Sequence, residues 1–250
     1  MPPSDAPALA TAEPAVGVAP GALGWTTTRR AGSFGLGSEE SVGLVIDRWH
    51  RLLDELEPFG VYRLVSATQV HGAIVEEHSA GWRGWLRLRG VDGHITRTPG
   101  TALVVTVADC TPVFISHPHG VIAALHAGWR GTASGILPAA LEAMNRLGCP
   151  AKECHVHLGP AICGRCYEVG PEVFQAVYGS RETEPGLLDV RQVLVDQAAR
   201  YGVHALTVSP LCTRCDQGRF FSHRGGDAGR QLGVFALLPT VPQETLTVSS

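Results

Sequence analysis

Three short runs of β-branched and apolar residues between positions 102 and 127 constrain the fold more than any other part of the sequence. They read ALVVTVA (102–108), PVFIS (112–116) and GVIAALHA (120–127), with polar or Pro-Gly turns between them. Apolar runs of this length, bounded by turn residues, are typical of β-strands. We therefore expect three strands of one sheet.

A helix and a further strand are expected next. Residues 132–148, TASGILPAALEAMNRLG, have a helical pattern, with Thr132 as the candidate N-cap and Gly148 as the terminator. Pro138 within this segment indicates a late start or a kink. The strand CHVHLG (154–159) then completes a strand–helix–strand unit.

The remaining segments continue this alternation and predict a mixed α and β class. Helices are expected at 39–57, 170–179 and 189–202, and strands at 61–67 and 203–210. Residues 1–20 are rich in alanine and proline and are predicted to be a disordered leader, while 241–250 form a polar tail. The folded region is then 21–240.

Composition excludes several classes of protein. A formal net charge of −3 argues against a nucleic-acid partner. Lys152 is the only lysine, so no Walker phosphate loop is present, and an anion would be held by arginines or backbone amides. No apolar run approaches the ~18 residues of a membrane span. Seven cysteines without a secretory signal favour the reducing cytoplasm.

Two Cys-x-x-Cys pairs could form a zinc site. They are Cys163 with Cys166, and Cys212 with Cys215. Two such pairs suit a tetrahedral structural zinc, but the segment between them is predicted to contain two helices rather than a short ribbon. The alternative is a group of reduced cysteines that lie near one another without a metal.

Two His-x-His pairs raise the question of copper. They are His117 with His119, and His155 with His157. Copper oxidases combine several such pairs with a Cys-His-Met cluster, whereas this chain has only two methionines. The chain therefore has few of the ligands that a copper cluster needs.

Three further candidates each follow a β-run beside a small or backbone-permissive residue: His71, Cys110 and His126. Open α/β sheets gather ligand-binding side chains at strand ends. Spacing alone leaves two possibilities, a shared metal site or three separately packed side chains.

Seven motifs occur in the order found in a known family: QVHG (69–72), DGHIT (92–96), ADCTP (108–112), HAGWRGT (126–132), GPAICGRCYEVG (159–170), LCT (211–213), and FFSHR with a later GR (220–230). On these motifs the chain resembles the laccase-domain family, also named multicopper polyphenol oxidoreductases, purine nucleoside phosphorylases or peptidoglycan editing factors. The resemblance implies a single α/β (mixed α+β) domain with a central mixed β-sheet flanked by helices. It also implies that His71, Cys110 and His126 are zinc ligands with an open fourth position.

The resemblance further implies phosphorolysis of purine nucleosides such as adenosine and inosine, with adenosine deamination and methylthioadenosine cleavage also attributed to the family. Arg29 and Arg130 are candidates for binding phosphate, because a guanidinium matches phosphate oxygens in a two-pronged geometry. Gln69 could hold the base or the ribose. Asp109 and Asp92 could orient a ligand imidazole or accept a proton, although Asp92 with Gly93 is also a good turn dipeptide.

One departure from the family pattern concerns the N-terminal wall of the expected pocket. Ala31 replaces a glycine, and the following SFGLGSEE segment is short and lacks the family's asparagine. Three alternatives stay open: a copper-dependent polyphenol oxidase (laccase), a peptidoglycan precursor editing factor, and a non-catalytic scaffold stabilised by zinc. Nothing in the sequence requires more than a monomer.

Overall fold

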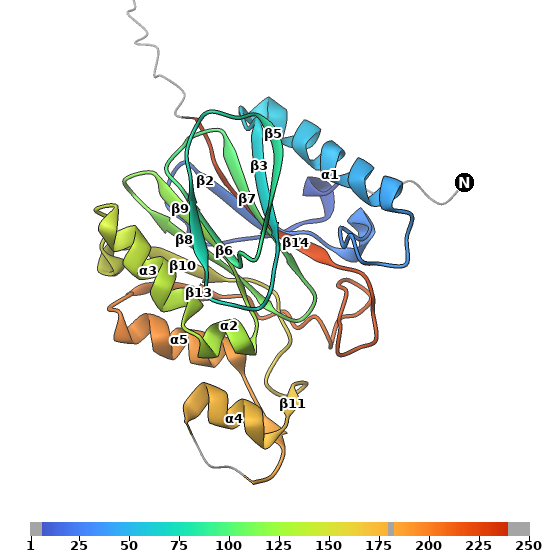
Figure 1. The fold of residues 1–250 in the computed structure, drawn as a ribbon, viewed down its shortest axis with the longest axis vertical. Coiled ribbons are helices and arrows are strands. Elements are labelled where there is room, and N and C mark those ends of the chain that lie inside the picture. The colour runs from blue at the N-terminus through green and yellow to red at the C-terminus, as the bar shows by residue number, and fades with distance from the viewer. Residues whose placement is uncertain (1–6, 180–182, 240–250) are drawn as a thin grey trace, which may run out of the picture.

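The computed structural model describes residues 7–179 and 183–239. Within these ranges two six-stranded sheets pack face to face, with α1 outside the first sheet and α3 and α5 outside the second (Figure 1). In hydrogen-bonded order, the first sheet contains β1 (Glu13–Pro14), β2 (Ala22–Thr26), β14 (Gln231–Leu237), β7 (Thr101–Val107), β3 (Arg63–Thr68) and β5 (Gly84–Arg89). The second contains β13 (Ala205–Val208), β10 (His155–Leu158), β8 (Thr111–His117), β9 (Val121–Ala127), β6 (Gly93–Thr96) and β4 (Val75–His78).

The remaining elements are helices, short 3₁₀ turns and one small ladder. The helices are α1 (Val42–Leu56), α2 (Trp129–Ala133), α3 (Ile136–Arg146), α4 (Pro171–Tyr178) and α5 (Val190–Arg200). The 3₁₀ turns are η1 (Leu9–Thr11), η2 (Arg29–Ala31), η3 (Glu57–Phe59) and η4 (Ala151–Glu153), and the ladder pairs β11 (Glu168–Val169) with β12 (Gly186–Leu187). In the described part of the chain, no helix is long and apolar enough to cross a membrane.

Strands β8 and β9 are buried on both faces because they lie in the middle of this layered structure. Phe114 and Ile122 belong to the apolar cluster between the two sheets, together with Leu103 of β7 and Phe235 of β14. The rings of Phe114 and Phe235 lie 5.1 Å apart. Burial on both faces explains why these strands appear in the sequence as continuous apolar runs rather than as alternating patterns.

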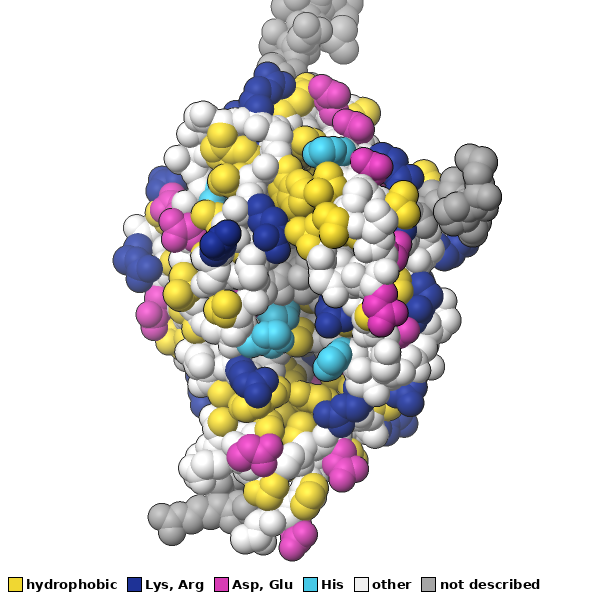
Figure 2. Space-filling model, turned by 45° about the vertical axis from the view of Figure 1, so that its right-hand side comes forward, with side chains coloured by type: hydrophobic (Ala, Val, Ile, Leu, Met, Phe, Trp, Pro, Cys, Tyr) yellow, Lys and Arg dark blue, Asp and Glu magenta, His cyan; other side chains and the backbone are white. Residues whose placement is uncertain are grey.

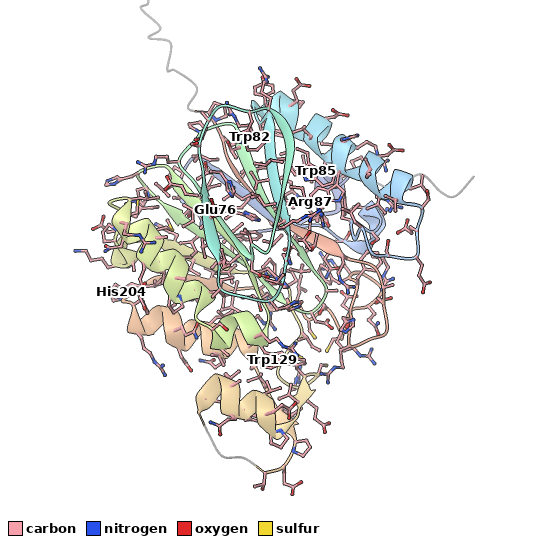
Figure 3. The ribbon with its side chains drawn as sticks, in the orientation of Figure 1. Glu76, Trp82, Trp85, Arg87, Trp129 and His204 are labelled. Carbon is pink, nitrogen blue, oxygen red and sulfur yellow. The ribbon has the colours of Figure 1, made fainter. Side chains whose placement is uncertain are left out.

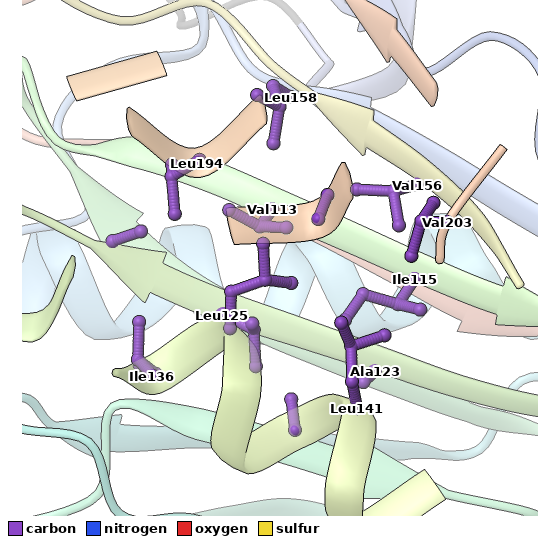
Figure 4. Packing of buried hydrophobic residues seen from close by; sticks show 14 of the residues in the cluster. Val113, Ile115, Ala123, Leu125, Ile136, Leu141, Val156, Leu158, Leu194 and Val203 are labelled. Carbon is purple, nitrogen blue, oxygen red and sulfur yellow. The ribbon is translucent and has the colours of Figure 1, made fainter. Parts of the chain in front are cut away.

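The opposite face of the second sheet packs against α3 and α5. Val113 and Leu125 point toward Ile136 and Leu141 of α3 and Leu194 of α5 in one buried cluster (Figure 4). Each fully buried aliphatic side chain contributes about 1.5–3 kcal/mol to folding. This cluster anchors the strands whose ends carry the candidate ligands.

Helix α1, which lies within the helix predicted at 39–57, covers the outer face of the first sheet. Trp49 and Leu52 are buried on its inner face. The Trp49 ring stacks on Trp85 of β5 at a centroid distance of 4.6 Å, and its indole N–H donates to the carbonyl of Phe34. The helix therefore joins β5 to the segment that follows η2.

The expected α+β class and single domain are confirmed, but the strands divide between two sheets. β7 pairs with β14 and β3 of the first sheet, whereas β8 and β9 belong to the second. The expectation that all three strands share one sheet is therefore wrong. Asp109, which lies in the short segment between β7 and β8 where the chain passes from the first sheet to the second, has a left-handed backbone (φ 82°).

The helix predicted at 132–148 is divided. Thr132 does not cap it, because Thr132 lies inside the short helix α2. α3 begins at Ile136, after the left-handed Gly135, so Pro138 occupies its third position. A proline there costs no helical hydrogen bond, since the first N–H groups of a helix have no acceptor within it. The late start inferred from Pro138 is confirmed.

Residues 7–20 belong to the folded domain rather than to a disordered leader. The backbone N–H groups of Ala8 and Leu9 donate to the carboxylate of Glu55 on α1, each at 3.1 Å. β1 pairs with β2, and the N–H of Ala19 donates to Ser116 Oγ at 2.8 Å. These partners lie far away in the sequence, which is why composition alone indicates disorder. Residues 1–6 of the predicted leader and the predicted tail 241–250 lie outside the described residues.

Candidate metal centre and pocket

The register of the second sheet places Cys110 beside His126. β8 and β9 pair antiparallel around the turn at 118–120, with Pro112 opposite His126. Cys110 immediately precedes β8, so it lies at the same end of the hairpin. His126 shares strand parity with Ile122, which faces the first sheet, and its imidazole therefore points toward the space between the sheets.

A buried carboxylate, Asp92, organises the segment that carries His71. Asp92 accepts hydrogen bonds at 2.9–3.1 Å from the backbone N–H groups of Val70, His71 and Gly72. These bonds hold His71 in a left-handed conformation (φ 59°) that a non-glycine residue rarely adopts. Asp92 Oδ1 also lies 2.9 Å from His126 Nδ1. One carboxylate thus positions two of the three predicted ligands.

His71, Cys110 and His126 converge, which is the arrangement that the family resemblance implies and that spacing alone left open. One ligand atom from each lies within 4.8 Å of the others. The motif HAGWRG leaves room for them at its first glycine, because a Cβ on Gly128 would come 2.8 Å from Cys110 Sγ and 3.3 Å from His71 Cδ2. A Cβ on Gly131 would come 2.9 Å from the carbonyl oxygen of Gly72. Both glycines therefore allow a close approach around the candidate ligands.

The electrostatics of this group suit a divalent cation. Burial alone would raise the pKa of the Cys110 thiol, but the charge and hydrogen bond of His126 and the contact with His71 outweigh it and lower the pKa to about 6. Burial alone would lower the pKa of His126, but the Cys110 thiolate and Asp92 together raise it to about 9. At neutral pH Cys110 is thus a thiolate paired with a protonated His126, and a cation that binds here would displace the His126 proton. One thiolate with two neutral imidazoles is a donor set that zinc prefers.

His71, Cys110 and His126, here called the triad, line a pocket of about 690 Å³ at one end of the two sheets. A hollow bordered by histidine, arginine and apolar side chains is visible on the face shown in Figure 2. Figure 3 labels two lining residues, Trp129 at the beginning of α2 and Arg87 on β5. The other lining side chains used below are Gln69, Asp109, Arg130, Ile162, Tyr167, Arg224 and Arg230.

The two arginines predicted to bind phosphate are placed differently. Arg130 lines the pocket, with its guanidinium 4.3 Å from the Trp129 ring. Arg29 does not line it. Its guanidinium forms an ion pair with Asp227 at 2.6 Å, donates to the carbonyls of Gln217 and Phe220, and so stabilises the loop before β14.

Gln69 lines the pocket but uses its amide to bridge two strands of the first sheet. Its Oε1 accepts from the N–H of Thr106 at 2.7 Å, and its Nε2 donates to the carbonyl of the same residue at 2.8 Å. The amide therefore extends the pairing of β3 with β7 beyond the last backbone hydrogen bonds. One Nε2 hydrogen stays available to a ligand.

Asp109 also faces the pocket, but it contacts none of the three ligand side chains through a hydrogen bond that the structure records. Its carboxylate accepts from Thr213 Oγ1 at 2.6 Å and from the backbone N–H of Arg224 at 2.7 Å. Asp92 immediately precedes β6 and does not lie in a turn, so the turn predicted for Asp92 with Gly93 is wrong. Asp92, rather than Asp109, is the carboxylate that pairs with the imidazole of a candidate ligand, His126. Asp109 instead connects the segment between β7 and β8 to the loop between β13 and β14.

The pocket also contains several residues for which the sequence predicts no role. Arg224 lies in the loop before β14, donates to the carbonyl of Glu168 and has its guanidinium 4.9 Å from the Tyr167 ring. Arg87 and Arg230 add positive charge to the lining. FFSHR contains Arg224, so the motif was the available signal, but nothing in the sequence indicates that this loop meets the end of β7.

Two other groups of candidate ligands lie outside the pocket centre, within the described residues. The four cysteines of the Cys-x-x-Cys pairs have their sulfurs within 4.8 Å of one another. The ligand atoms of His117, His119 and Cys149 form a second group of the same compactness. All seven cysteines are free.

The fold and the site define a single-domain α+β protein with a candidate two-histidine, one-cysteine metal centre in a pocket at the end of two packed sheets. The chain belongs to the multi-copper polyphenol oxidoreductase laccase family, whose model matches residues 29–238. This family is the one that the sequence motifs indicate.

Three relatives illustrate the similarity. A purine nucleoside phosphorylase of Streptomyces coelicolor is 40% identical over 179 residues, covering 68% of this chain and 74% of the relative. The purine nucleoside phosphorylase YlmD of Geobacillus stearothermophilus is 33% identical, covering 85% and 89%. Its crystal structure matches with a TM-score of 0.81 at 29% identity, covering 88% of this chain and 93% of that one. The adenosine deaminase RL5, from an unknown prokaryote, is 36% identical, covering 57% and 61%.

Proposed function

We propose that this protein is a zinc-dependent purine nucleoside phosphorylase, which converts adenosine or inosine and phosphate to the free base and ribose 1-phosphate. The observation that carries the proposal is the three-ligand group on the wall of a pocket that arginines and aromatic rings also line. Three protein ligands leave one tetrahedral position open, which is the pattern of a catalytic rather than a structural zinc. Relatives named purine nucleoside phosphorylase support the choice of reaction.

His71, Cys110 and His126 would hold the ion, and Asp92 fixes the orientation of His126. The carboxylate of Asp92 can only accept, so it keeps the proton of His126 on Nδ1 and leaves Nε2 for the metal. When bound, zinc supplies Lewis acidity toward an oxygen of a reactant. The hydrogen bonds that the backbone N–H groups of residues 70–72 donate to Asp92 keep His71 in place without rearrangement.

Arginines of the pocket would bind the phosphate, and its aromatic and apolar side chains would bind the purine of the nucleoside. Arg130 and Arg224 present guanidinium groups that match phosphate oxygens. Trp129, Tyr167 and Ile162 offer aromatic and apolar surface suited to a purine ring. Gln69 retains one amide hydrogen for a polar group of the nucleoside.

The test is product analysis with the purified, zinc-loaded protein. Adenosine with phosphate is expected to yield adenine and ribose 1-phosphate, and inosine to yield hypoxanthine and the same sugar phosphate. His126→Ala is expected to abolish both reactions, while Asp54→Asn, an exposed position on α1, leaves them unchanged. Failure of the zinc-loaded protein to cleave any purine nucleoside would count against the proposal.

Adenosine deamination is a second candidate, favoured by the similarity to the adenosine deaminase RL5. It needs no phosphate, so the same assay separates it: adenosine without phosphate would give inosine and ammonia. Copper-dependent phenol oxidation is distinguished by dioxygen uptake with a phenol after copper loading. The cytoplasmic location and the monomeric state also stay proposals, the first supported by seven free cysteines.

A further inference from the structure

Four cysteine side chains that the proposed reaction does not use come together in two loops that adjoin the pocket. Cys163 and Cys166 lie in the loop between β10 and β11, and Cys212 and Cys215 lie in the loop between β13 and β14. All four sulfurs lie within 4.8 Å of one another. Of the four, Cys212 is buried and Cys215 is exposed, so the group lies at the edge of the core.

Backbone contacts hold the two loops in a fixed relationship. Ala161 and Cys212 form an isolated parallel bridge, and the N–H of Thr213 donates to the carbonyl of Ala161 at 3.2 Å. Two N–H groups are directed at Cys212 Sγ, from Cys163 at 3.2 Å and from Cys215 at 3.4 Å. Backbone N–H groups aimed at a sulfur stabilise its thiolate form, which is the form that binds metals.

We propose that Cys163, Cys166, Cys212 and Cys215 hold a second zinc ion, in a closed tetrahedral site of four thiolates. Two Cys-x-x-Cys pairs with converging sulfurs are the donor set of structural zinc, with no position left for a substrate. Binding exchanges the remaining thiol protons for the cation, so no electron transfer or other reactant is required. A single disulfide would use two of the four sulfurs and leave the other two unexplained.

This site would stabilise one wall of the catalytic pocket. Thr213, the neighbour of Cys212, donates through its hydroxyl to Asp109 Oδ1 at 2.6 Å. The N–H of Ile162, the neighbour of Cys163, donates to the carbonyl of Asp109 at 3.0 Å. Asp109 precedes the ligand Cys110 and has a strained left-handed backbone. The four-cysteine ion therefore fixes the loops that hold Asp109 in this conformation.

The chain gains stability from such an ion because it closes a long loop. Cys163 and Cys212 are 49 residues apart. Joining residues so far apart removes conformational entropy from the unfolded chain, and zinc that binds only the folded state adds its binding free energy to folding. We infer that the ion supports the fold and the pocket wall rather than the reaction.

The first test counts zinc in the purified full-length protein by elemental analysis. The proposal predicts two ions per chain in the wild type and one in Cys215→Ser, a substitution at an exposed position. His71→Ala is also expected to retain one, because it removes a ligand of the pocket centre only. His119→Ala, in the third ligand group, and Cys154→Ala, a buried cysteine outside all three groups, should both retain two.

A second test uses Co²⁺ as the probe, after the zinc is removed by chelation. Four thiolates around Co²⁺ give intense thiolate-to-cobalt charge-transfer bands, and these should persist in His71→Ala and weaken in Cys215→Ser. Circular dichroism confirms that the variants are folded. A zinc count in Cys215→Ser equal to that of the wild type would overturn the proposal, as would iron at these cysteines or a Cys166–Cys215 disulfide found by mass spectrometry. None of these readouts depends on nucleoside cleavage, so the proposed reaction can fail independently.

Discussion

Asp92 and His126 form a buried pair, in which 2.9 Å separates the carboxylate Oδ1 from the imidazole Nδ1. Burial alone would raise the pKa of Asp92, but hydrogen bonds from His126 and from the N–H groups of Gly72 and Val70 outweigh it and lower the pKa. Asp92 is thus an anion in the folded protein. It joins the end of β9 to the segment that carries His71.

Asp92→Asn is expected to weaken zinc binding by about 10–100-fold, the usual effect of removing the carboxylate behind a metal-bound histidine. The amide lacks the charge that stabilises the Nδ1 proton, and it cannot accept through both terminal atoms. Competition with a chromogenic chelator measures the affinity at the pocket centre. The exposed Asp54→Asn is the control, and an unchanged affinity in Asp92→Asn would show that this carboxylate does not tune the metal.

Gly128→Ala is expected to lower the affinity of the same centre by at least about tenfold, because its Cβ would come 2.8 Å from Cys110 Sγ. The backbone of Gly128 lies at φ −84°, which any residue adopts, so crowding of the ligands is the cause. Gly43→Ala, on α1, meets only Ser41 Oγ at 3.8 Å and should retain the wild-type affinity. Equal zinc affinities in the two variants would contradict the geometry of the triad.

The sequence contained a usable signal for part of this site. The turn at 118–120 lies midway between Cys110 and His126, so a β-hairpin through it brings the two together. No comparable signal linked Asp92 to His71, since that contact depends on the parallel pairing of β4 with β6. The helices follow from their apolar periodicity, whereas the division into two sheets depends on pairings between strands that are distant in the sequence, such as β14 with β7 and β10 with β8.

Which arginines line the pocket depends even more on tertiary structure than the contact of Asp92 with His71 does. Arg29 and Arg130 are equivalent as sequence candidates, because each offers a guanidinium that matches phosphate oxygens. Only the fold shows that the ion pair with Asp227 occupies Arg29 and that Arg224 enters the pocket from a distant loop. Local pattern determines which residues can form strands and helices, but not which loops meet.

Arg130→Gln is expected to raise the KM for phosphate by about 10–100-fold, since hydrogen bonds from a charged donor contribute about 1.5–3 kcal/mol. Steady-state kinetics with phosphate varied at saturating nucleoside measures this. Arg29→Gln should instead lower the melting temperature, because it breaks the contact with Asp227, and should leave the KM for phosphate near that of the wild type. The reverse pattern would restore Arg29 as the phosphate ligand.

The free energy of unfolding is expected to decrease as the pH falls from about 6.5 toward 4. Burial lowers the pKa of His78 to about 4, although Glu77 opposes the shift, and burial with the neighbouring His78 lowers that of His94 to about 3. Both values lie below the 6.5 of the unfolded chain, so in this range the unfolded state binds more protons and acid favours it. His157, with a pKa lowered to about 4 by burial, adds to the effect.

Urea unfolding at a series of pH values measures this dependence. His78→Gln removes one titrating group. The decrease in the free energy of unfolding between pH 7 and pH 4 should then be smaller than in the wild type, by an amount on the order of 3 kcal/mol. His204→Gln is the control, because His204 is exposed and has no recorded contact. A His78→Gln profile that parallels the wild type would contradict the role of the buried pair.

The N-terminal segment is expected to stabilise the domain, although its composition suggests disorder. Removing residues 1–20 deletes β1 and the N–H groups that donate to Glu55. Glu55→Ala alone leaves the N–H groups of Ala8 and Leu9 without their acceptor, which costs about 1–3 kcal/mol. In a domain of this size each kcal/mol lowers the melting temperature by about 2–4 °C. Scanning calorimetry should show a lower melting temperature in both variants. Glu57→Ala is the control, because Glu57 is exposed and its carboxylate has no recorded partner, so its melting temperature should not change. A truncated protein as stable as the full chain would show that these contacts contribute nothing.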